Sequence, residues 1–280
     1  MVLDPYKDYL ADLFDRAAGS YEQTGVAFFA PAGGRVVELG GLAAGERALD
    51  VGCGRGAVLV PAAEAVGEGG LVRGIDLSAG MLAHLRAELR RRGLGQALVS
   101  QGDAEKLDFP DGSFDVVFAG MVLFFLADAR AAVRDWRRVL RPGGRLVMST
   151  MDVRVDRGKA INDAALAAVA PFLGPDPRPA GHPGADDRYR TRESIEELLA
   201  GTGFGVARFV EETLPLRFAG PQEYWEWMGS SSMRVIVERV PPGDRQRAGR
   251  AVAAGLEPFR GVDGSVVLPM RMRYTCAVAE

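Results

Sequence analysis

The stretch RALDVGCGRGA, residues 47–57, decides the fold. It begins as a short apolar run that glycines stop, and residues 55–66 are predicted to form a helix. Glycines are needed where a tight turn requires a positive φ, or where the backbone must approach a ligand closely. The N-terminus of the following helix presents free N–H groups. The stretch therefore predicts a strand, a glycine turn and a helix that together can hold a ligand.

An acidic residue completes this arrangement. Asp76 lies twenty residues after Gly56, at the end of the next predicted strand, residues 71–76. A carboxylate there can accept hydrogen bonds from both ribose hydroxyls of a nucleotide. The spacing Gly52-x-Gly54-x-x-Ala57 also satisfies the dinucleotide fingerprint, so the glycine motif alone leaves the cofactor open. The combination predicts a nucleoside-binding site.

Strands and helices alternate from Glu46 to Thr150. The leucines of residues 79–92 recur at helical spacing, and Ser78 is placed to cap that helix. Residues 114–120 are nearly all apolar, as expected of a strand covered on both faces. Further strands are expected at 97–101 and 145–150, and a helix at 128–140. Five strands with crossover helices predict a parallel, doubly wound α/β sheet.

The pattern changes outside that block. Two or three helices are expected within residues 4–40, and residues 171–187 are too rich in proline and glycine for regular structure. The remaining expected elements are a capped helix at 191–200, a strand at 205–212, a helical insertion at 220–257 and a final strand at 271–279. The chain shows no internal repeat and no clear linker. We therefore expect a single elaborated domain over residues 1–280.

Composition excludes several classes of protein. The formal net charge of −3 and the pI near 5.6 provide no field that attracts nucleic acid. Two cysteines without a CxxC motif, with only His84 and His182 as histidines, argue against a metal site. The longest strongly apolar stretch, Val116 to Ala127, has 12 residues, whereas a membrane span needs about 20. The acidic, amphipathic N-terminus has no signal-peptide pattern, so we expect a soluble, cytoplasmic protein.

Four motifs in order resemble the class I S-adenosylmethionine-dependent methyltransferases. They are LDVGCGRGA (49–57), GIDLSAGML (74–82), GDAEKLDFPDGSFDVVFAG (102–120) and RVLRPGGRLVMST (138–150). In addition, DRAAGSYEQTG (15–25) resembles the helical lid of the ubiquinone and menaquinone methyltransferases. The resemblance implies a mostly parallel seven-stranded Rossmann-like sheet. It also implies a lid at 1–44, a cofactor-binding core at 45–150, and acceptor-side elements at 151–280 with an insertion at about 219–258.

The resemblance also implies roles in binding S-adenosylmethionine. Asp50 is expected near the methionine amino group, and Asp76 on the ribose. Leu77 and Met81 are expected to pack on adenine, and Asp103 to accept from the adenine amino group. The full expected set is Tyr21, Asp50, Gly52, Cys53, Gly54, Asp76, Leu77, Met81, Asp103, Ala104, Ala119 and Gly120.

The acceptor side departs from the resembled family. Relatives often have histidines just after the fourth strand, where this chain has Phe124 and Phe125. His182 is then the one candidate for a histidine base, although an exposed loop histidine is the simpler interpretation. The aromatic group within residues 221–233 suits a flat apolar ligand. The expected acceptor-side residues are Phe124, Phe125, Tyr224, Trp225 and Met228.

These observations favour methyl transfer to oxygen or carbon of a small hydrophobic metabolite, such as a quinone, a polyketide or another secondary metabolite. The Phe124–Phe125 pair leaves open an alternative, in which a protein of this fold binds S-adenosylmethionine but directs a cyclisation. An NAD(P)-dependent oxidoreductase is a further alternative. No tyrosine in the chain has a lysine four positions later, which argues against the commonest small dehydrogenases. The sequence does not indicate an oligomeric state.

Overall fold

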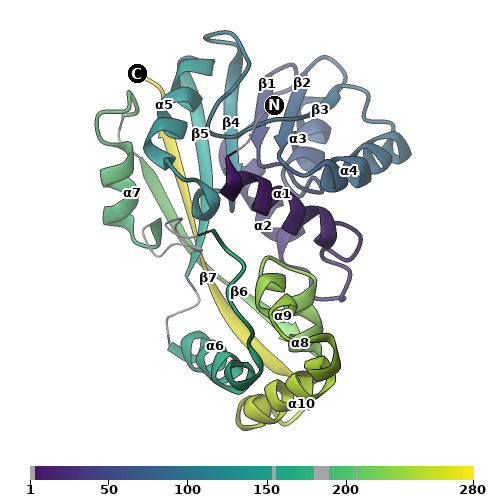
Figure 1. The fold of residues 1–280 in the computed structure, drawn as a ribbon. Coiled ribbons are helices and arrows are strands. Elements are labelled where there is room, and N and C mark those ends of the chain that lie inside the picture. Colours follow the sequence, from purple (N-terminus) through teal and green to yellow (C-terminus); the bar gives the residue numbers. More distant parts are fainter. Residues whose placement is uncertain (1–3, 153–155, 180–188, 206) are drawn as a thin grey trace.

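A single mixed sheet organises the part of the chain that the computed structural model describes, residues 4–152, 156–179, 189–205 and 207–280. Within these residues the sheet has seven strands in the order β3-β2-β1-β4-β5-β7-β6 (Figure 1). The strands are β1 (Arg47–Val51), β2 (Leu71–Asp76), β3 (Ala97–Gln101), β4 (Phe114–Gly120), β5 (Leu140–Asp152), β6 (Arg208–Phe218) and β7 (Val266–Val278). β1 to β5 pair in parallel, and β7 runs antiparallel between β5 and β6. The predicted fold class is confirmed.

The centre of the sheet positions the glycine turn. β1 lies between β2 and β4, and its last four residues are buried. The chain leaves β1 toward β2 on one side, whereas β4 is added on the other side, so the strand order reverses at this point. Ligands of open α/β sheets bind at such a reversal, outside the carboxyl ends of the strands. Residues that follow β1, β2 and β4 therefore gather around one crevice.

Helices cover both faces of the sheet, as the two hydrophobic clusters show. Val36, Leu59 and Leu82 belong to the cluster on one face, and Trp136 and Ile195 to the cluster on the other. The helices of the upper part are α1 (Pro5–Ala17), α2 (Phe29–Gly40), α3 (Leu59–Val66), α4 (Ala79–Arg92), α5 (Ala129–Val139) and α7 (Arg192–Leu199). Ser78 caps α4 as predicted, since its hydroxyl accepts from the Met81 N–H at 3.0 Å.

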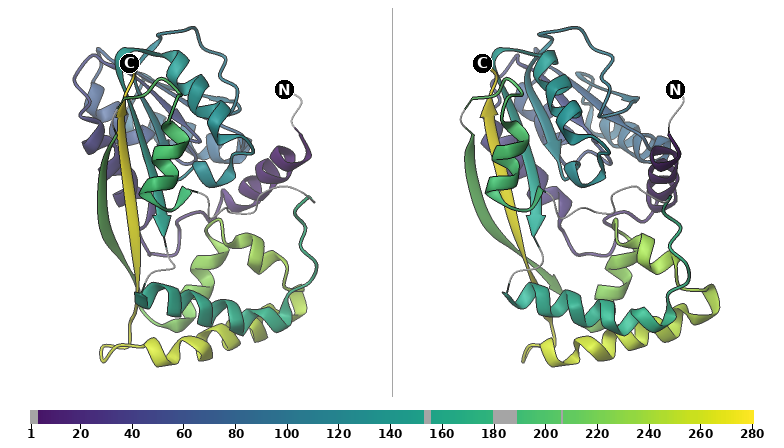
Figure 2. Two further views of the ribbon diagram at one scale, coloured as in Figure 1. Left: turned by 90° about the vertical axis from the view of Figure 1, so that its left-hand side faces the viewer. Right: turned by 60° about the vertical axis from the view of Figure 1, so that its left-hand side comes forward.

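A second group of helices lies at the far end of β6 and β7. This group consists of α6 (Asp156–Val169), α8 (Pro221–Gly229), α9 (Arg234–Glu238) and α10 (Arg245–Leu256). Figure 2 shows the two long strands extending from the upper part of the molecule to these helices. α1 lies between the two parts, in front of the ends of β1 and β4 (Figure 1).

Several boundaries differ from the sequence-based expectation, each for a local reason. α3 begins at Leu59 instead of residue 55, because the glycine turn continues with positive φ through Gly56. β6 pairs over its whole length with residues 266–276 of β7, so both strands are longer than the predicted 205–212 and 271–279. β5 begins at Leu140, ahead of the predicted 145, with a shift of register against β4. In the described residues, every helix is too short or too polar to span a bilayer.

Candidate cofactor and acceptor site

The glycine turn can only be made by glycines. Gly52, Gly54 and Gly56 have φ of +69°, +50° and +93°, values that other residues rarely adopt. A Cβ on Gly52 would lie 2.8 Å from Val122 Cγ2, and one on Gly56 would lie 2.5 Å from Leu85 Cδ1. Gly52 and Gly56 therefore pass too close to their neighbours to carry a side chain, and Gly54 is favoured by its positive φ.

Asp76 holds the turn against the end of β2. Its Oδ2 accepts from the Gly54 N–H at 2.8 Å, and its Oδ1 accepts from the Ser78 N–H at 2.9 Å. Burial raises the pKa of Asp76, although these N–H donors oppose the shift. Each carboxylate oxygen has a second lone pair for a further donor. The geometry therefore allows Asp76 to order the turn and still accept from a bound ligand.

Asp50 is a carboxylate that lacks part of its hydrogen bonding. Its side chain is 1% exposed, and Oδ2 has no hydrogen-bond partner among the described residues. Burial, followed by the charge of Asp76, raises the pKa of Asp50 well above its ordinary value. A buried carboxyl oxygen without a hydrogen-bond partner is costly, so it is a marker of a binding site. A positively charged amino group of a ligand would satisfy it.

Lys7 forms an ion pair with Asp103, the residue that was expected to accept from the adenine amino group. Its Nζ donates to Asp103 Oδ2 at 2.8 Å and lies 3.3 Å from Glu105 Oε1. Burial alone would lower the pKa of Lys7, but the two carboxylates outweigh it and raise the pKa. Asp103 Oδ1 also accepts from the Glu105 N–H at 2.9 Å, which closes a local turn. Sequence reasoning missed Lys7, because no local pattern connects residues 96 positions apart.

The rest of α1 is fastened over the same crevice. Asp15 Oδ1 accepts from the Gly80 N–H at 2.8 Å and from Ser78 Oγ at 2.5 Å. Arg55 of the glycine turn donates to the carbonyl of Tyr21 at 3.0 Å. The first helix and the turn after it therefore cover the glycine turn, which is the position expected of a lid.

Aromatic rings line the boundary between the core and the segment formed by α1 and the turn after it. The Tyr21 ring stacks on Phe29 at 4.8 Å, and Phe14 meets Tyr21 and Phe125 edge-on at 6.2 and 5.3 Å. Burial strongly raises the pKa of Tyr21, so its hydroxyl remains protonated. Rings in these arrangements are stabilised beyond their buried area. The cluster gives the crevice an apolar wall next to Gly120.

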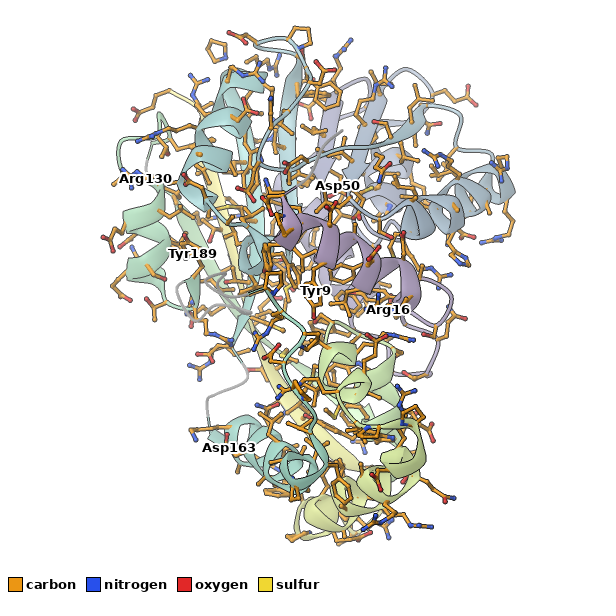
Figure 3. The ribbon with its side chains drawn as sticks, in the orientation of Figure 1. Tyr9, Arg16, Asp50, Arg130, Asp163 and Tyr189 are labelled. Atoms are coloured by element: carbon orange, nitrogen blue, oxygen red, sulfur yellow. The ribbon has the colours of Figure 1, made fainter. Side chains whose placement is uncertain are left out.

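One cavity of about 1430 Å³ brings most of the predicted residues together. Figure 3 shows Asp50 behind α1 and Tyr9 below it, on the two sides of this helix. The predicted cofactor residues that line the cavity are Tyr21, Asp50, Gly52, Cys53, Gly54, Asp76, Leu77, Met81, Asp103, Ala104 and Gly120. Ala119 is not among the lining residues and lies fully buried in the core. Side chains alternate along a strand, which separates Ala119 from Gly120.

The acceptor-side predictions divide into two groups. Phe124, Phe125 and Tyr224 line the cavity, whereas Trp225 and Met228 do not. Trp225 packs against α10, where a Cβ on Gly249 would lie 2.8 Å from the indole. Met228 is fully buried in the hydrophobic core.

Trp227 takes the place in the cavity wall that Trp225 was expected to have. Its ring lies 5.6 Å from that of Tyr224, and both residues line the cavity. The Tyr224 hydroxyl in turn donates to Asn162 Oδ1 at 3.4 Å. The helical spacing could have revealed this, because residues three apart share one face and adjacent residues do not.

Neither histidine is seen near Gly120 in the part of the chain that the structure describes, so neither is placed as a general base there. His84 lies exposed on α4 at the outer edge of the cavity. His182 lies outside the described residues. In the portion of the chain with described coordinates, no group of three or more His, Cys, Asp or Glu side chains could hold a metal ion.

The fold and the site define an α/β enzyme with a nucleoside cofactor at the reversal of its strand order. Residues 49–148 match the family model described as "Methyltransferase domain". Nocamycin O-methyltransferase of Saccharothrix syringae is 39% identical over 251 residues, which are 87% of this chain and 88% of the relative. Aklanonic acid methyltransferase DauC of a Streptomyces species is 39% identical over 171 residues, which are 61% and 72% of the two chains. The chain belongs to the S-adenosylmethionine-dependent methyltransferases, as its motifs predicted.

A solved structure shares the fold at lower identity. The crystal structure of the (4+2) cyclase SpnF aligns with a TM-score of 0.59 at 22% identity, over 100% of this chain and 98% of that one. Identity at this level shows the common fold and carries no argument about cyclisation. The relatives above instead support methyl transfer, and they set aside the nicotinamide-dependent alternative.

S-adenosylmethionine is the cofactor of this enzyme. The residues present fit it on two structural grounds. The unpartnered oxygen of buried Asp50 suits a ligand ammonium group, and Gly54, whose N–H donates to Asp76, leaves open space where a side chain would stand.

Proposed function

We propose that the enzyme methylates an oxygen or carbon atom of a flat, largely hydrophobic metabolite of the polyketide or quinone type. The observation that carries the proposal is the single cavity of about 1430 Å³, which joins Asp50 and Asp76 to an aromatic chamber. The names of two relatives, a nocamycin O-methyltransferase and an aklanonic acid methyltransferase, support the same class of acceptor.

In this proposal each core residue binds a different part of S-adenosylmethionine. Asp76 accepts from the ribose hydroxyls, and Asp50 accepts from the methionine ammonium group. Leu77 and Met81 pack on adenine, and the Asp103–Ala104 segment borders its edge; all four residues line the cavity. Bound S-adenosylmethionine supplies an activated methyl group for an in-line displacement. The other five predicted cofactor residues that line the cavity need only provide shape and backbone contacts.

The acceptor side of the cavity aligns the acceptor molecule and excludes water. Phe124 and Phe125 make the wall beside Gly120 apolar, and Tyr224 and Trp227 close the other side. α1 covers the opening through the contacts of Lys7 and Asp15. Excluding water and aligning the acceptor atom with the methyl group supply much of the rate enhancement in such a reaction.

The proposal extends to the organisation of the protein. Residues 1–280 act as one domain, because α1 and the helices of the insertion line the same cavity as the cofactor-binding core. The partner is a small molecule, and the net charge of −3 does not favour nucleic acid. The free cysteines Cys53 and Cys276 support a location in the cytoplasm, where thiols stay reduced.

Calorimetric titration with S-adenosylhomocysteine, beside NADH, tests the cofactor assignment. We expect micromolar binding of S-adenosylhomocysteine and none of NADH. The acceptor class is then tested by incubating the enzyme with S-adenosylmethionine and a panel of polyketide and quinone acceptors. Formation of S-adenosylhomocysteine together with a methylated product supports the proposal. An altered acceptor without S-adenosylhomocysteine would instead establish the cyclisation alternative.

A further inference from the structure

Three elements meet at the wall of the cavity away from Asp50 and Asp76. They are α1, the end of α9, and residues 173–179, which we call the strap. Figure 2 shows the strap rising from the end of α6 toward α1. Two hydrogen bonds fasten it to the residue after α9: the Gly174 N–H donates to the Arg239 carbonyl at 2.8 Å, and Arg239 Nε donates to the Gly174 carbonyl at 3.2 Å. Arg239, Tyr9 and Arg178 all line the cavity.

Tyr9 contributes a hydroxyl without a hydrogen-bond partner to this wall of the cavity. Its hydroxyl oxygen is buried and has no hydrogen-bond partner among the described residues. Burial, followed by the charge of Asp176, raises the pKa of Tyr9, so the hydroxyl keeps its proton. Buried hydroxyls are nearly always hydrogen-bonded in native proteins. A phenol left without a partner inside a cavity indicates that a ligand atom accepts from it.

Two arginines beside Tyr9 share one carboxylate. Arg178 binds Asp176 through Nε at 3.0 Å and Nη2 at 2.5 Å, while Arg239 Nη1 lies 3.6 Å from the same Asp176 Oδ2. The side chain of Arg239 is 23% exposed. Arg178 holds the pKa of Asp176 down at about 2, so this carboxylate is fully ionised and still neutralises only one of the two guanidinium groups. Glu238, whose charge also acts on Tyr9, is already paired with Arg16 and Arg234, so the wall keeps a net positive charge.

We propose that Tyr9, Arg178 and Arg239 form an anion subsite that holds an ionised acidic oxygen of the methyl acceptor. The acceptor is then an aromatic or polyketide acid: its apolar body lies among the rings of Tyr224 and Trp227, and its carboxylate or acidic enol meets Arg239. Guanidinium groups bind such oxygens in a fixed fork, which orients the ligand as well as attracting it. The three residues position the acceptor and select it.

This inference rests on the proposed function, since it assigns the acceptor that shares the cavity with the cofactor. Its chemistry nevertheless goes beyond the aromatic lining. An apolar chamber alone would favour the neutral ligand of two with one shape, because a buried carboxylate without partners loses its hydration. A subsite with Arg239 and Tyr9 must prefer the anion, and this difference can be measured.

The test uses the full chain loaded with S-adenosylhomocysteine. The probes are anthraquinone-2-carboxylate and anthraquinone-2-carboxamide, which have the same flat body and differ in charge. Affinities are measured by calorimetry at pH 7.5. We expect the carboxylate to bind about tenfold more tightly or better, the range for hydrogen bonds to a charged group. Equal affinities for the two probes would overturn the inference.

Single substitutions test which residues cause the preference for the carboxylate probe. Arg239→Gln should weaken carboxylate binding far more than carboxamide binding and so remove most of the preference, and Tyr9→Phe should reduce the preference by a few fold. Arg239→Lys, which keeps the charge without the fork, should fall between Arg239→Gln and the parent. Arg250→Gln on the exposed face of α10 removes the same charge outside the cavity and should change neither probe. A full preference in Arg239→Gln, or an equal loss in Arg250→Gln, would contradict the subsite.

Failure of the underlying function gives a different result. If S-adenosylhomocysteine does not bind, the cofactor assignment is wrong, but the two probes can still be compared on the enzyme without it. A retained carboxylate preference that depends on Arg239 then supports the subsite by itself. Unchanged S-adenosylhomocysteine affinity in each variant shows that the substitutions have left the fold intact.

Discussion

The hydrogen bonds that Asp76 makes at the glycine turn and those of the acceptor half of the cavity span very different distances along the chain. Asp76 reaches its partners Ser78 and Gly54 across 2 and 22 residues. On the acceptor side, Tyr224 meets Asn162 across 62 residues, and Arg239 meets the strap at Gly174 across 65. The first half uses backbone groups at strand ends, and the second uses side chains from separate helices. Substitutions should therefore affect cofactor binding in the first half and acceptor choice in the second.

Removing the ribose acid should produce the largest effect on the cofactor half. Asp76→Ala deletes a carboxylate that both orders the glycine turn and, in the proposed function, binds the ribose. Hydrogen bonds to charged groups contribute about 1.5–3 kcal/mol, so S-adenosylhomocysteine affinity should fall about 10- to 150-fold. Calorimetric titration measures the change. Asp115→Ala is the control, since that carboxylate accepts from the Arg47 N–H far from the cavity. Equal losses in the two variants would show that the effect is merely structural.

Asp50→Asn should separate binding from stability by moving them in opposite directions. The folded pKa of Asp50 is raised above its ordinary 3.8, so folding favours the protonated form. The free enzyme should therefore lose stability as the pH rises from near 3.8 through that raised value, and the asparagine variant should lack this loss. At neutral pH the variant should melt at the same or a higher temperature, yet bind S-adenosylhomocysteine about tenfold more weakly. Thermal melts across pH, with and without S-adenosylhomocysteine, test both statements. A lower melting temperature in the free variant would refute the interpretation of Asp50 as an unsatisfied charge.

Trp227 and Trp225 allow a comparison between a ring in the cavity wall and a ring that packs on α10. Trp227→Leu removes a ring from the cavity wall and should raise the KM for an aromatic acceptor several-fold, because stacked and edge-on ring contacts contribute about 0.5–1.5 kcal/mol. Trp225→Leu removes a ring that packs on Gly249 and should lower the melting temperature while KM stays the same. Steady-state kinetics and thermal melts of both variants are compared. A KM that responds to Trp225→Leu instead would reverse the two assignments.

The smallest effect is expected where the two halves are fastened together. Lys7→Met leaves Asp103 and Glu105 without their cation, at side chains that are 16% and 10% exposed. We expect a loss of about 1 kcal/mol in stability and a modest weakening of S-adenosylhomocysteine binding as α1 loosens. Lys106→Met, at an exposed position, is the matched control and should change neither. Proteolysis that fails to cut α1 any faster in Lys7→Met would show that the ion pair does not hold the lid.

The sequence indicated the cofactor half well, and physics explains why. The glycine turn, Asp76 and the Ser78 cap depend on neighbours that are close in the chain, so their pattern is visible without coordinates. The lengths of β6 and β7 were underestimated, because their pairing with one another extends both strands. Lys7, Tyr9 and Arg239 were missed, since each acquires its partners only when distant helices meet. The aromatic composition of residues 221–233 does not by itself distinguish Trp225 from Trp227, whereas the helical spacing from Tyr224 favours Trp227.

The pairing of Phe218 with Val266 has a consequence for engineering. The whole helical insertion leaves the sheet at one of these residues and returns at the other, so its two ends are neighbours on adjacent strands. A segment of almost any length can therefore be exchanged there without stretching the chain, as with a cassette inserted at a single point. Transplanting the corresponding segment of a relative between these two positions would carry over the α8 and α9 part of an acceptor chamber while Asp50, Asp76 and the glycine turn remain untouched. Exchange of the insertion between the paired residues Phe218 and Val266 is therefore a way to change the methyl acceptor of the enzyme.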